Sequence, residues 1–124
     1  MRSIVFDSSC WIELLIQGPL AKVCDKELKH SSQVLVPTVV IYEVYRKISS
    51  SVSEDQALSA VALMSQHKVV DLTRDISLAA ADLSIAQKLP MADSLVLALA
   101  QHESAVLITL DNDFMDIPNA KVLR

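Results

Sequence analysis

The sequence predicts an α/β fold in which a parallel sheet is covered by helices on both faces. Four short apolar segments of strand length are separated by longer segments whose apolar residues follow helical spacing. Strands that alternate with helices are typical of parallel sheets. Gly18 is the only glycine in the chain, which argues against hairpin-rich all-β folds because their turns need glycine.

The first strand and the two helices after it are expected near the start of the chain. Residues 3–6 form a short apolar run that ends at Asp7. Residues 11–15 then follow helical spacing. After Gly18 a second helix is expected to run to about His30, because its apolar residues form one stripe.

A second strand is expected at residues 33–36, where Pro37 closes it. Thr38 can cap the helix that follows, which is expected to continue to about Ser49. The serine-rich residues 49–53 are expected to form a loop. This part of the chain therefore predicts one strand and one helix.

The next helix and strand follow from capping signals and an apolar run. Ser53 and Gln56 fit a capping box, which predicts a helix that continues to about Gln66. Residues 69–72 form a third apolar run and are expected to be a strand. Thr73 after it is expected to cap another helix.

The last third of the chain predicts a buried helix and two further strands. Pro90 breaks the helix that Thr73 begins, and a new helix is expected to start at about Asp93. Its residues are apolar nearly all round, so it should be buried. Residues 106–108 are expected to form a fourth strand, and residues 121–123 a short fifth one.

Length and composition predict a single domain over residues 1–124. The chain has 52% hydrophobic and 21% charged residues, which excludes intrinsic disorder because so apolar a chain can bury a core. No apolar stretch approaches the roughly 20 residues that a membrane span needs. The two cysteines, Cys10 and Cys24, have no framework spacing. We therefore expect a protein of the cytoplasm with no contact to a membrane.

Acidic residues follow the expected strands at several points. Asp7 ends the first strand and Asp111 ends the fourth, so both carboxylates project at one edge of the sheet if these strands are neighbours. Glu43 lies in an apolar helix with no cation before Arg46, and Asp93 begins the buried helix. Each aspartate taken singly can also be a helix cap or a turn former.

Carboxylates that converge without matching cations repel one another unless divalent ions neutralise them. Hard cations such as Mg²⁺ and Mn²⁺ take oxygen ligands, so the acidic set predicts a site for one of them. Such ions can activate water for the displacement at a phosphodiester. The net charge of −4 argues at first against nucleic acid as a partner. It becomes zero when Asp7, Glu43, Asp93 and Asp111 are left out of the tally, so the charge does not exclude RNA as a substrate.

Four motifs in order make the chain similar to a known family. The strand end Val5-Phe6-Asp7-Ser8-Ser9, the helix segment Val40-Ile41-Tyr42-Glu43-Val44, the helix start Ala92-Asp93-Ser94-Leu95 and the loop Thr109-Leu110-Asp111-Asn112-Asp113-Phe114 carry the likeness. The chain resembles the PIN-domain ribonucleases, in particular the VapC-type toxins of toxin–antitoxin modules. The match extends over essentially the whole chain. Many relatives have a glycine just before the third motif, where this chain has Lys88-Leu89-Pro90-Met91-Ala92.

The resemblance implies a three-layer α/β/α sandwich around a parallel sheet of four to five strands. It also implies a Mg²⁺ or Mn²⁺ site built from Asp7, Glu43, Asp93 and Asp111, with Asp113 as a fifth acid. Ser9 and Thr109 would be small polar neighbours of that site. The implied activity is endonucleolytic cleavage of RNA by metal-activated water.

Partners follow partly from the resemblance and partly from composition. The resemblance and the uncompensated acids imply a cognate antitoxin that places an arginine or lysine near the carboxylates. The high mean hydropathy of +0.37 favours a homodimer. Several basic residues are candidates for contacts to RNA phosphates, although a solvated charged face explains each equally well: Arg46, Lys47, Lys68, Arg74 and Lys88. A PIN-like module that binds RNA or protein without catalysis is the alternative function.

Overall fold

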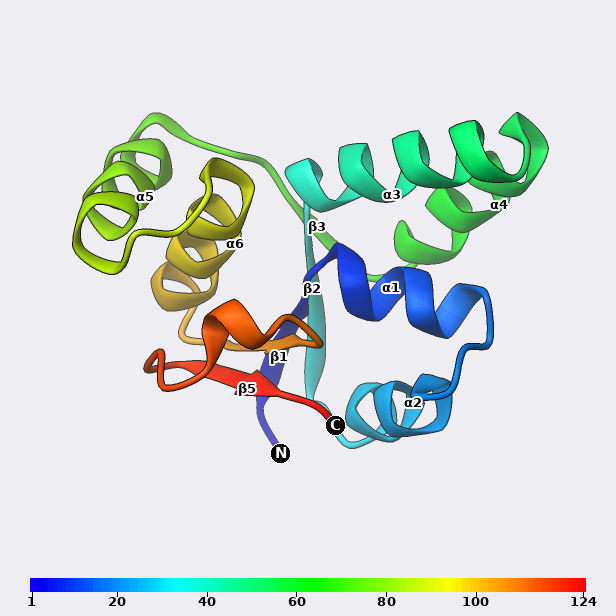
Figure 1. Cartoon of the computed structure of the whole chain (residues 1–124), viewed down its shortest axis with the longest axis horizontal. Coiled ribbons are helices and arrows are strands. Elements are labelled where there is room, and N and C mark those ends of the chain that lie inside the picture. Colours follow the sequence, from blue (N-terminus) through cyan, green and yellow to red (C-terminus); the bar gives the residue numbers. More distant parts are fainter.

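Five parallel strands form one sheet in the order β3-β2-β1-β4-β5 in the computed structural model, which describes residues 1–124 (Figure 1). Strands β2 and β3 lie on one side of β1 and strands β4 and β5 on the other, so the parallel sheet is doubly wound. The strands are β1 (Ser3–Phe6), β2 (Gln33–Pro37), β3 (Lys68–Val70), β4 (Val106–Thr109) and β5 (Ala120–Val122).

Strand β1 is the centre of the sheet and determines where the chemistry lies. Ile4 pairs with Val34 of β2 on one side and with Val106 of β4 on the other. The same register places Phe6 opposite Ile108. The carboxyl ends of β1 and β4 therefore lie side by side, and the residues that follow them meet at one sheet edge.

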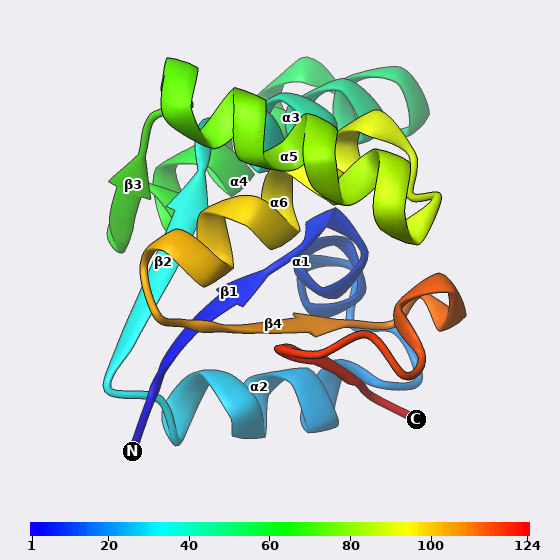
Figure 2. The ribbon, with the colours of Figure 1, turned by 90° about the vertical axis from the view of Figure 1, so that its left-hand side faces the viewer.

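The helices cover both faces of the sheet, which confirms the three-layer α/β/α architecture. The chain moves in one direction from β1 to β3 and then returns across the sheet to β4, so right-handed crossovers place the later helices on the opposite face. Figures 1 and 2 show α5 and α6 on one face and the other helices on the other face. The helices are α1 (Ser8–Leu15), α2 (Ala21–Lys29), α3 (Thr38–Ser51), α4 (Glu54–Met64), α5 (Arg74–Gln87) and α6 (Met91–His102), with a short 3₁₀ helix η1 (Asn112–Phe114) after β4.

The start and end of α3 differ from the sequence prediction. Pro37 holds the cap position and Thr38 is the first helical residue, so the prediction of a Thr38 cap is wrong. The helix continues through Ser51, and the predicted loop is reduced to its last two residues. Ser50 donates its hydroxyl hydrogen bond to the Lys47 carbonyl oxygen at 3.1 Å, which lets a serine remain helical.

Two predicted caps are present. The Ser53 hydroxyl accepts a hydrogen bond from the Gln56 amide at 3.1 Å, and the Thr73 hydroxyl accepts one from the Ile76 amide at 3.2 Å. The Ser53 amide itself donates to the Ile48 carbonyl oxygen at 3.1 Å, so the backbone of the preceding helix takes the place of a Gln56 side-chain acceptor. These caps fix where α4 and α5 begin.

The turn between α5 and α6 uses a left-handed residue that is not glycine. Lys88 ends α5 with φ 58° and ψ 40°. The chain then reverses direction; Leu89 is buried, and Pro90 directly precedes α6. The Ser84 hydroxyl donates to the Leu89 carbonyl oxygen at 2.8 Å and holds the turn. This turn sets the position at which α6, and with it Asp93, enters the sheet edge.

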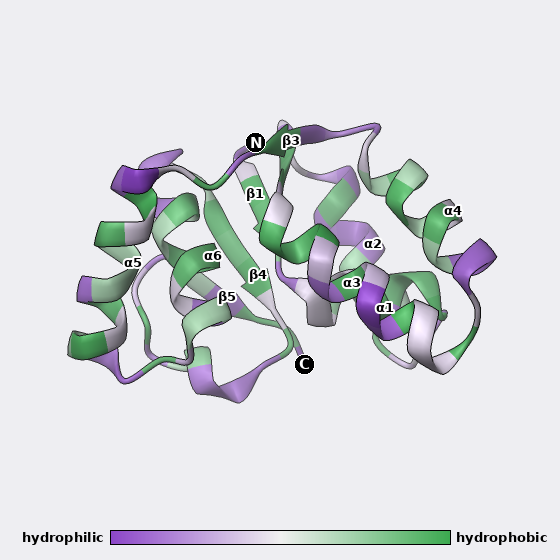
Figure 3. Cartoon of the chain, turned by 90° about the horizontal axis from the view of Figure 1, so that it is seen from above, coloured by the Kyte–Doolittle hydropathy of each residue, from purple (hydrophilic) through white to green (hydrophobic).

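The core lies on both faces of β1 and β4 and along α6. Residues 96–100 of α6 are all buried, which confirms the prediction of a buried helix. Figure 3 shows hydrophobic segments on α6, β1 and β4, and further hydrophobic residues on the outer helix α5. No single helix is long and apolar enough to cross a membrane, and α5 and α6 reach that length and hydropathy only together, with a bend of 116° between them.

Candidate metal centre

Asp7 is the best-anchored acid of the sheet edge. It follows β1 and caps α1, where its Oδ1 accepts hydrogen bonds from the Cys10 amide at 3.1 Å and from the Ser9 hydroxyl at 2.6 Å. Its other carboxylate oxygen accepts a hydrogen bond from the Thr109 hydroxyl. The side chain is buried, so these donors fix its orientation.

Thr109 and Ser9 connect the ends of β1 and β4. The Thr109 hydroxyl donates to Asp7 and accepts from the Asp111 amide at 2.9 Å. The Ser9 hydroxyl also donates to Asp7 and accepts from the Leu110 amide at 3.1 Å. Each hydroxyl therefore donates one hydrogen bond and accepts another, and the two side chains link the loop after β4 to the end of β1. They lie beside Asp7, where the sequence prediction places them.

Three aspartates come together on the loop after β4 and the start of α6. Carboxylate oxygens of Asp93, Asp111 and Asp113 lie within 4.8 Å of one another, which is close enough to share one cation. Asp111 caps η1 and accepts a hydrogen bond from the Asp113 amide at 2.9 Å, so the loop holds its own two acids together. Asp93 is the third residue of α6 and not its cap, because the helix begins at Met91.

Glu43 lies on α3 at the other side of Asp7 and is not part of the three-aspartate cluster. Its side chain is half-buried. It shares a pocket with Ser8, Arg46 and Lys47, with a cavity volume of about 440 Å³. The two cations lie one helical turn farther along α3, which was visible in the sequence, whereas the proximity of Ser8 depends on how α1 packs against α3.

Burial and neighbouring carboxylates raise the pKa values of Asp7, Glu43 and Asp93. Burial raises the pKa of Asp93 to about 6, and the carboxylates of Asp111 and Asp7 add to this shift. Burial likewise raises the pKa of Asp7, although hydrogen bonds from Ser9 and Thr109 lower it. The pKa of Glu43 is raised by burial and by the charge of Asp7.

No lysine or arginine neutralises the acids of this edge. The ion pairs of the chain involve only other carboxylates: Asp25, Glu27 and Asp75. A donor set made of oxygens only, with no protein cation beside it, fits a hard divalent ion such as Mg²⁺ or Mn²⁺. Asp93, Asp111 and Asp113 are the residues that can hold it together, with Asp7 beside them.

The chain matches a known protein family over most of its length. The sequence model of the PIN domain matches residues 4–120. The chain belongs to the PIN domain family. This PIN domain contains all the acids discussed above within the matched residues. No curated protein matches the chain in sequence.

Solved structures share the fold of this PIN domain over nearly their whole length. A toxin–antitoxin complex from Klebsiella pneumoniae is 24% identical, with a TM-score of 0.80, and the match covers 96% of each chain. VapBC2 from Rickettsia felis, bound to a DNA fragment of its promoter, is 18% identical with a TM-score of 0.77, covering 98% of each chain. VapC20 from Mycobacterium tuberculosis, described as a toxin that cleaves the sarcin–ricin loop, is 16% identical with a TM-score of 0.77, covering 93% of this chain and 95% of that one.

Proposed function

We propose that this PIN domain is a Mg²⁺- or Mn²⁺-dependent endoribonuclease of the cytoplasm and the toxin of a toxin–antitoxin pair. The observation that carries the proposal is the set of three aspartates within 4.8 Å of one another beside the anchored Asp7, with no protein cation among them. Its support from comparison is the shared fold with VapC20, which is described as a toxin that cleaves the sarcin–ricin loop, and with a toxin–antitoxin complex.

The residues of the sheet edge divide the work of hydrolysis among them. Asp93, Asp111 and Asp113 would hold the divalent ion, and Asp7 and Glu43 would complete its surroundings. A divalent ion held there would supply an activated water and would neutralise charge on the phosphodiester. In the reaction the water oxygen forms a new bond to phosphorus while the bond to one ester oxygen breaks. Ser9 and Thr109 keep Asp7 aimed at this edge through their hydrogen bonds.

The approach of RNA is proposed along the pocket between α1 and α3. Arg46 and Lys47 line this pocket together with Glu43, and both cations are exposed. Lysine and arginine side chains bind phosphate oxygens by charge-assisted hydrogen bonds. Phosphates next to the scissile one would therefore lie over α3, and the acids would face the bond that is cut.

The activity is tested by incubating the protein with RNA in Mg²⁺, in Mn²⁺ and in EDTA, beside the variant Asp7→Asn. We expect cleavage in both metals and none in EDTA, because the carboxylates cannot organise the displacement alone. Asp7→Asn is expected to lower the rate by about 100-fold or more. Cleavage that survives both EDTA and the substitution would contradict the proposal. RNA binding without cleavage in any metal would favour the non-catalytic alternative.

The proposed antitoxin has a groove to occupy between α1, α3 and α4. This groove has a cavity volume of about 310 Å³ and mainly apolar walls. Ile16, Val52 and Leu63 are among its lining residues and are 59%, 64% and 49% exposed. It continues along the same α1–α3 pair that borders Glu43. One apolar segment could therefore fill the groove while an adjoining arginine or lysine reaches the acids.

Co-purification with the product of the neighbouring gene tests this partner. We expect a stable complex whose RNA cleavage is inhibited. Leu63→Glu should weaken the complex by about tenfold or more, because it buries a charge in an apolar contact. Leu58→Glu makes the same exchange on the same helix, at a residue that is 51% exposed and does not line the groove. Equal loss of binding in both variants would contradict docking in the groove.

A homodimer is proposed through the face of α5 and α6. Leu78, Ile85 and Met91 are 62%, 81% and 77% exposed there, beside a mainly apolar groove with a cavity volume of about 650 Å³. Exposed apolar surface of this kind is typical of protein contacts. Sedimentation equilibrium should give twice the 13.6 kDa of one chain, and Ile85→Lys should restore the monomer. A monomeric wild-type protein at micromolar concentration would contradict this arrangement.

A further inference from the structure

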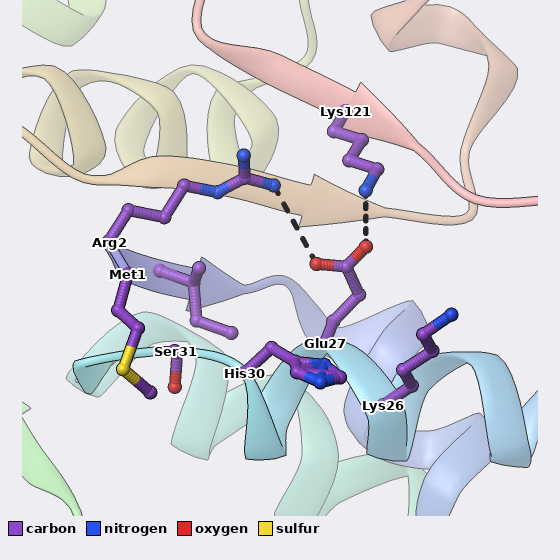
Figure 4. Close-up of a pocket in the computed structure, with 8 residues that line it drawn as sticks. Met1, Arg2, Lys26, Glu27, His30, Ser31 and Lys121 are labelled. Atoms are coloured by element: carbon purple, nitrogen blue, oxygen red, sulfur yellow. Dashed lines mark hydrogen bonds and ion pairs between the residues drawn. The ribbon is translucent and has the colours of Figure 1, made fainter.

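A second charged pocket lies at the end of the sheet opposite the acids. It is formed where β1 and β2 begin, between the end of α2 and strand β5 (Figure 4), with a cavity volume of about 410 Å³. Its polar lining comes from three distant parts of the chain: Arg2, Lys26, Glu27, His30, Ser31 and Lys121. None of these residues belongs to the acidic edge of the sheet.

The charges of this pocket do not cancel. Glu27, whose side chain is 16% exposed, forms ion pairs with Arg2, at 3.6 Å between the Nη2 and Oε2 atoms, and with Lys121. Figure 4 shows both cations directed at this one carboxylate. Lys26 lines the same pocket and takes part in no ion pair. Three cations and one carboxylate leave a formal charge of +2 in a chain whose net charge is −4.

Glu27 holds two of the cations in place through ion pairs. Its two carboxylate oxygens bind Arg2 and Lys121 from different sides, which holds both side chains over the pocket although each is about half exposed, at 50% and 48%. Cations held in place lose less side-chain entropy when they bind an anion. His30 adds ring nitrogens at the same wall. The pocket thus presents several hydrogen-bond donors around an excess of positive charge.

We propose that this pocket binds a phosphate group. Phosphate offers several acceptor oxygens and a negative charge, which match the guanidinium and ammonium donors of the pocket. The phosphate can come from a free phosphate monoester or from the backbone of an RNA strand. The second source rests on the proposed ribonuclease function and would make the pocket a remote contact for the substrate.

The geometry limits which RNA can use the pocket. Arg2 and Asp7 lie five residues apart along an extended strand, which separates the pocket from the acids by roughly 17 Å. A stacked strand carries about one phosphate per 3.4 Å, so at least about five nucleotides are needed to reach from one site to the other. Short RNA can occupy only one of the two sites at a time, whereas longer RNA can contact both ends of the sheet.

Titration with inorganic phosphate and with a nucleoside monophosphate, in EDTA, tests the site without any catalytic step. We expect Lys26→Gln to weaken binding by about threefold to fivefold, because it removes one positive charge from the pocket. Lys22→Gln is the matched control, since Lys22 lies one turn earlier on α2, is exposed and does not line the pocket. Phosphorus NMR gives the affinities, and thermal melting verifies that each variant is folded.

RNA of two lengths separates the two sources of phosphate. In EDTA, Lys26→Gln should weaken the binding of a twelve-nucleotide RNA more than that of a trinucleotide if the pocket holds the substrate backbone, because only the longer RNA contacts both sites at once. Equal effects on both RNAs, with phosphate still bound, would assign the pocket to free phosphate esters. Identical phosphate affinities for Lys26→Gln and Lys22→Gln would overturn the site itself. Cleavage in Mg²⁺ is measured separately, so failure of the ribonuclease proposal is recognised independently.

Discussion

Asp93→Asn is expected to abolish RNA cleavage and at the same time to stabilise the metal-free protein. The Asp93 carboxylate lies within 4.8 Å of those of Asp111 and Asp113, so its loss removes one of three oxygen donors for the ion. We expect cleavage to fall by about 100-fold or more. The amide also removes the repulsion and the desolvation cost of Asp93, both of which are reflected in its pKa of about 6.

The pH dependence of this stabilisation follows from the sign of the pKa shift. The pKa of Asp93 is higher in the folded protein than the ordinary aspartate value of 3.8, so the folded state binds the proton more tightly than the unfolded state. The stabilisation of the folded protein by the proton on Asp93 is present in full below pH 3.8 and is lost as the pH rises through about 6. Asp93→Asn should therefore raise the melting temperature by about 2–5 °C at pH 7, a modest gain because solvent screens the half-exposed carboxylate.

Calorimetry in EDTA and in Mg²⁺ measures both effects. Mg²⁺ should raise the melting temperature of the wild-type protein and have less effect on the variant, because ligand binding stabilises the folded state. Asp82→Asn is the matched control, since Asp82 is exposed on α5 and forms no ion pair. A variant that melts lower than wild type in EDTA at pH 7 would show that Asp93 has a structural role instead.

Thr109→Val is expected to have the opposite effect on stability. Valine has nearly the same shape but removes the hydroxyl that donates to Asp7 and accepts from the Asp111 amide. Thr109 is fully buried, so no water replaces these partners. Leaving a buried donor unsatisfied costs about 1–3 kcal/mol, which lowers the melting temperature of a domain of this size by several degrees. Cleavage should fall as well, because Asp7 loses one of its donors.

Thr109→Ser provides the control for this prediction. Serine keeps the hydroxyl and loses only a methyl group, so the hydrogen bonds to Asp7 and from Asp111 can be retained. We expect Thr109→Ser to preserve most of the cleavage activity, although the missing methyl group costs some stability. Equal activity of the valine and serine variants would contradict a positioning role for the hydroxyl. Thermal denaturation and RNA cleavage, measured side by side, separate the two contributions.

Local patterns were sufficient to predict most of the helices and strands. The apolar runs at residues 3–6 and 106–108 are strands because side chains on both faces of a parallel sheet are buried. Capping by Ser53 and Thr73 depends on bonds to residues three positions away, which the sequence displays directly. The predicted end of α3 failed because serine has a weak local preference, which the packing of α3 against α4 overrides.

The amino-acid sequence by itself identified the acids of the candidate site, because the carboxylates that follow strands are visible along the chain. Their distances depend on contacts between residues far apart, which only the folded chain specifies. The strand order places β1 beside β4 and thereby Asp7 beside Thr109, whereas the Lys88 turn brings Asp93 to Asp111. The basic pocket depends even more on the tertiary structure, since residues 2, 26–31 and 121 meet only when the sheet is complete. Side-chain chemistry is local, but the convergence of charges is a property of the tertiary packing.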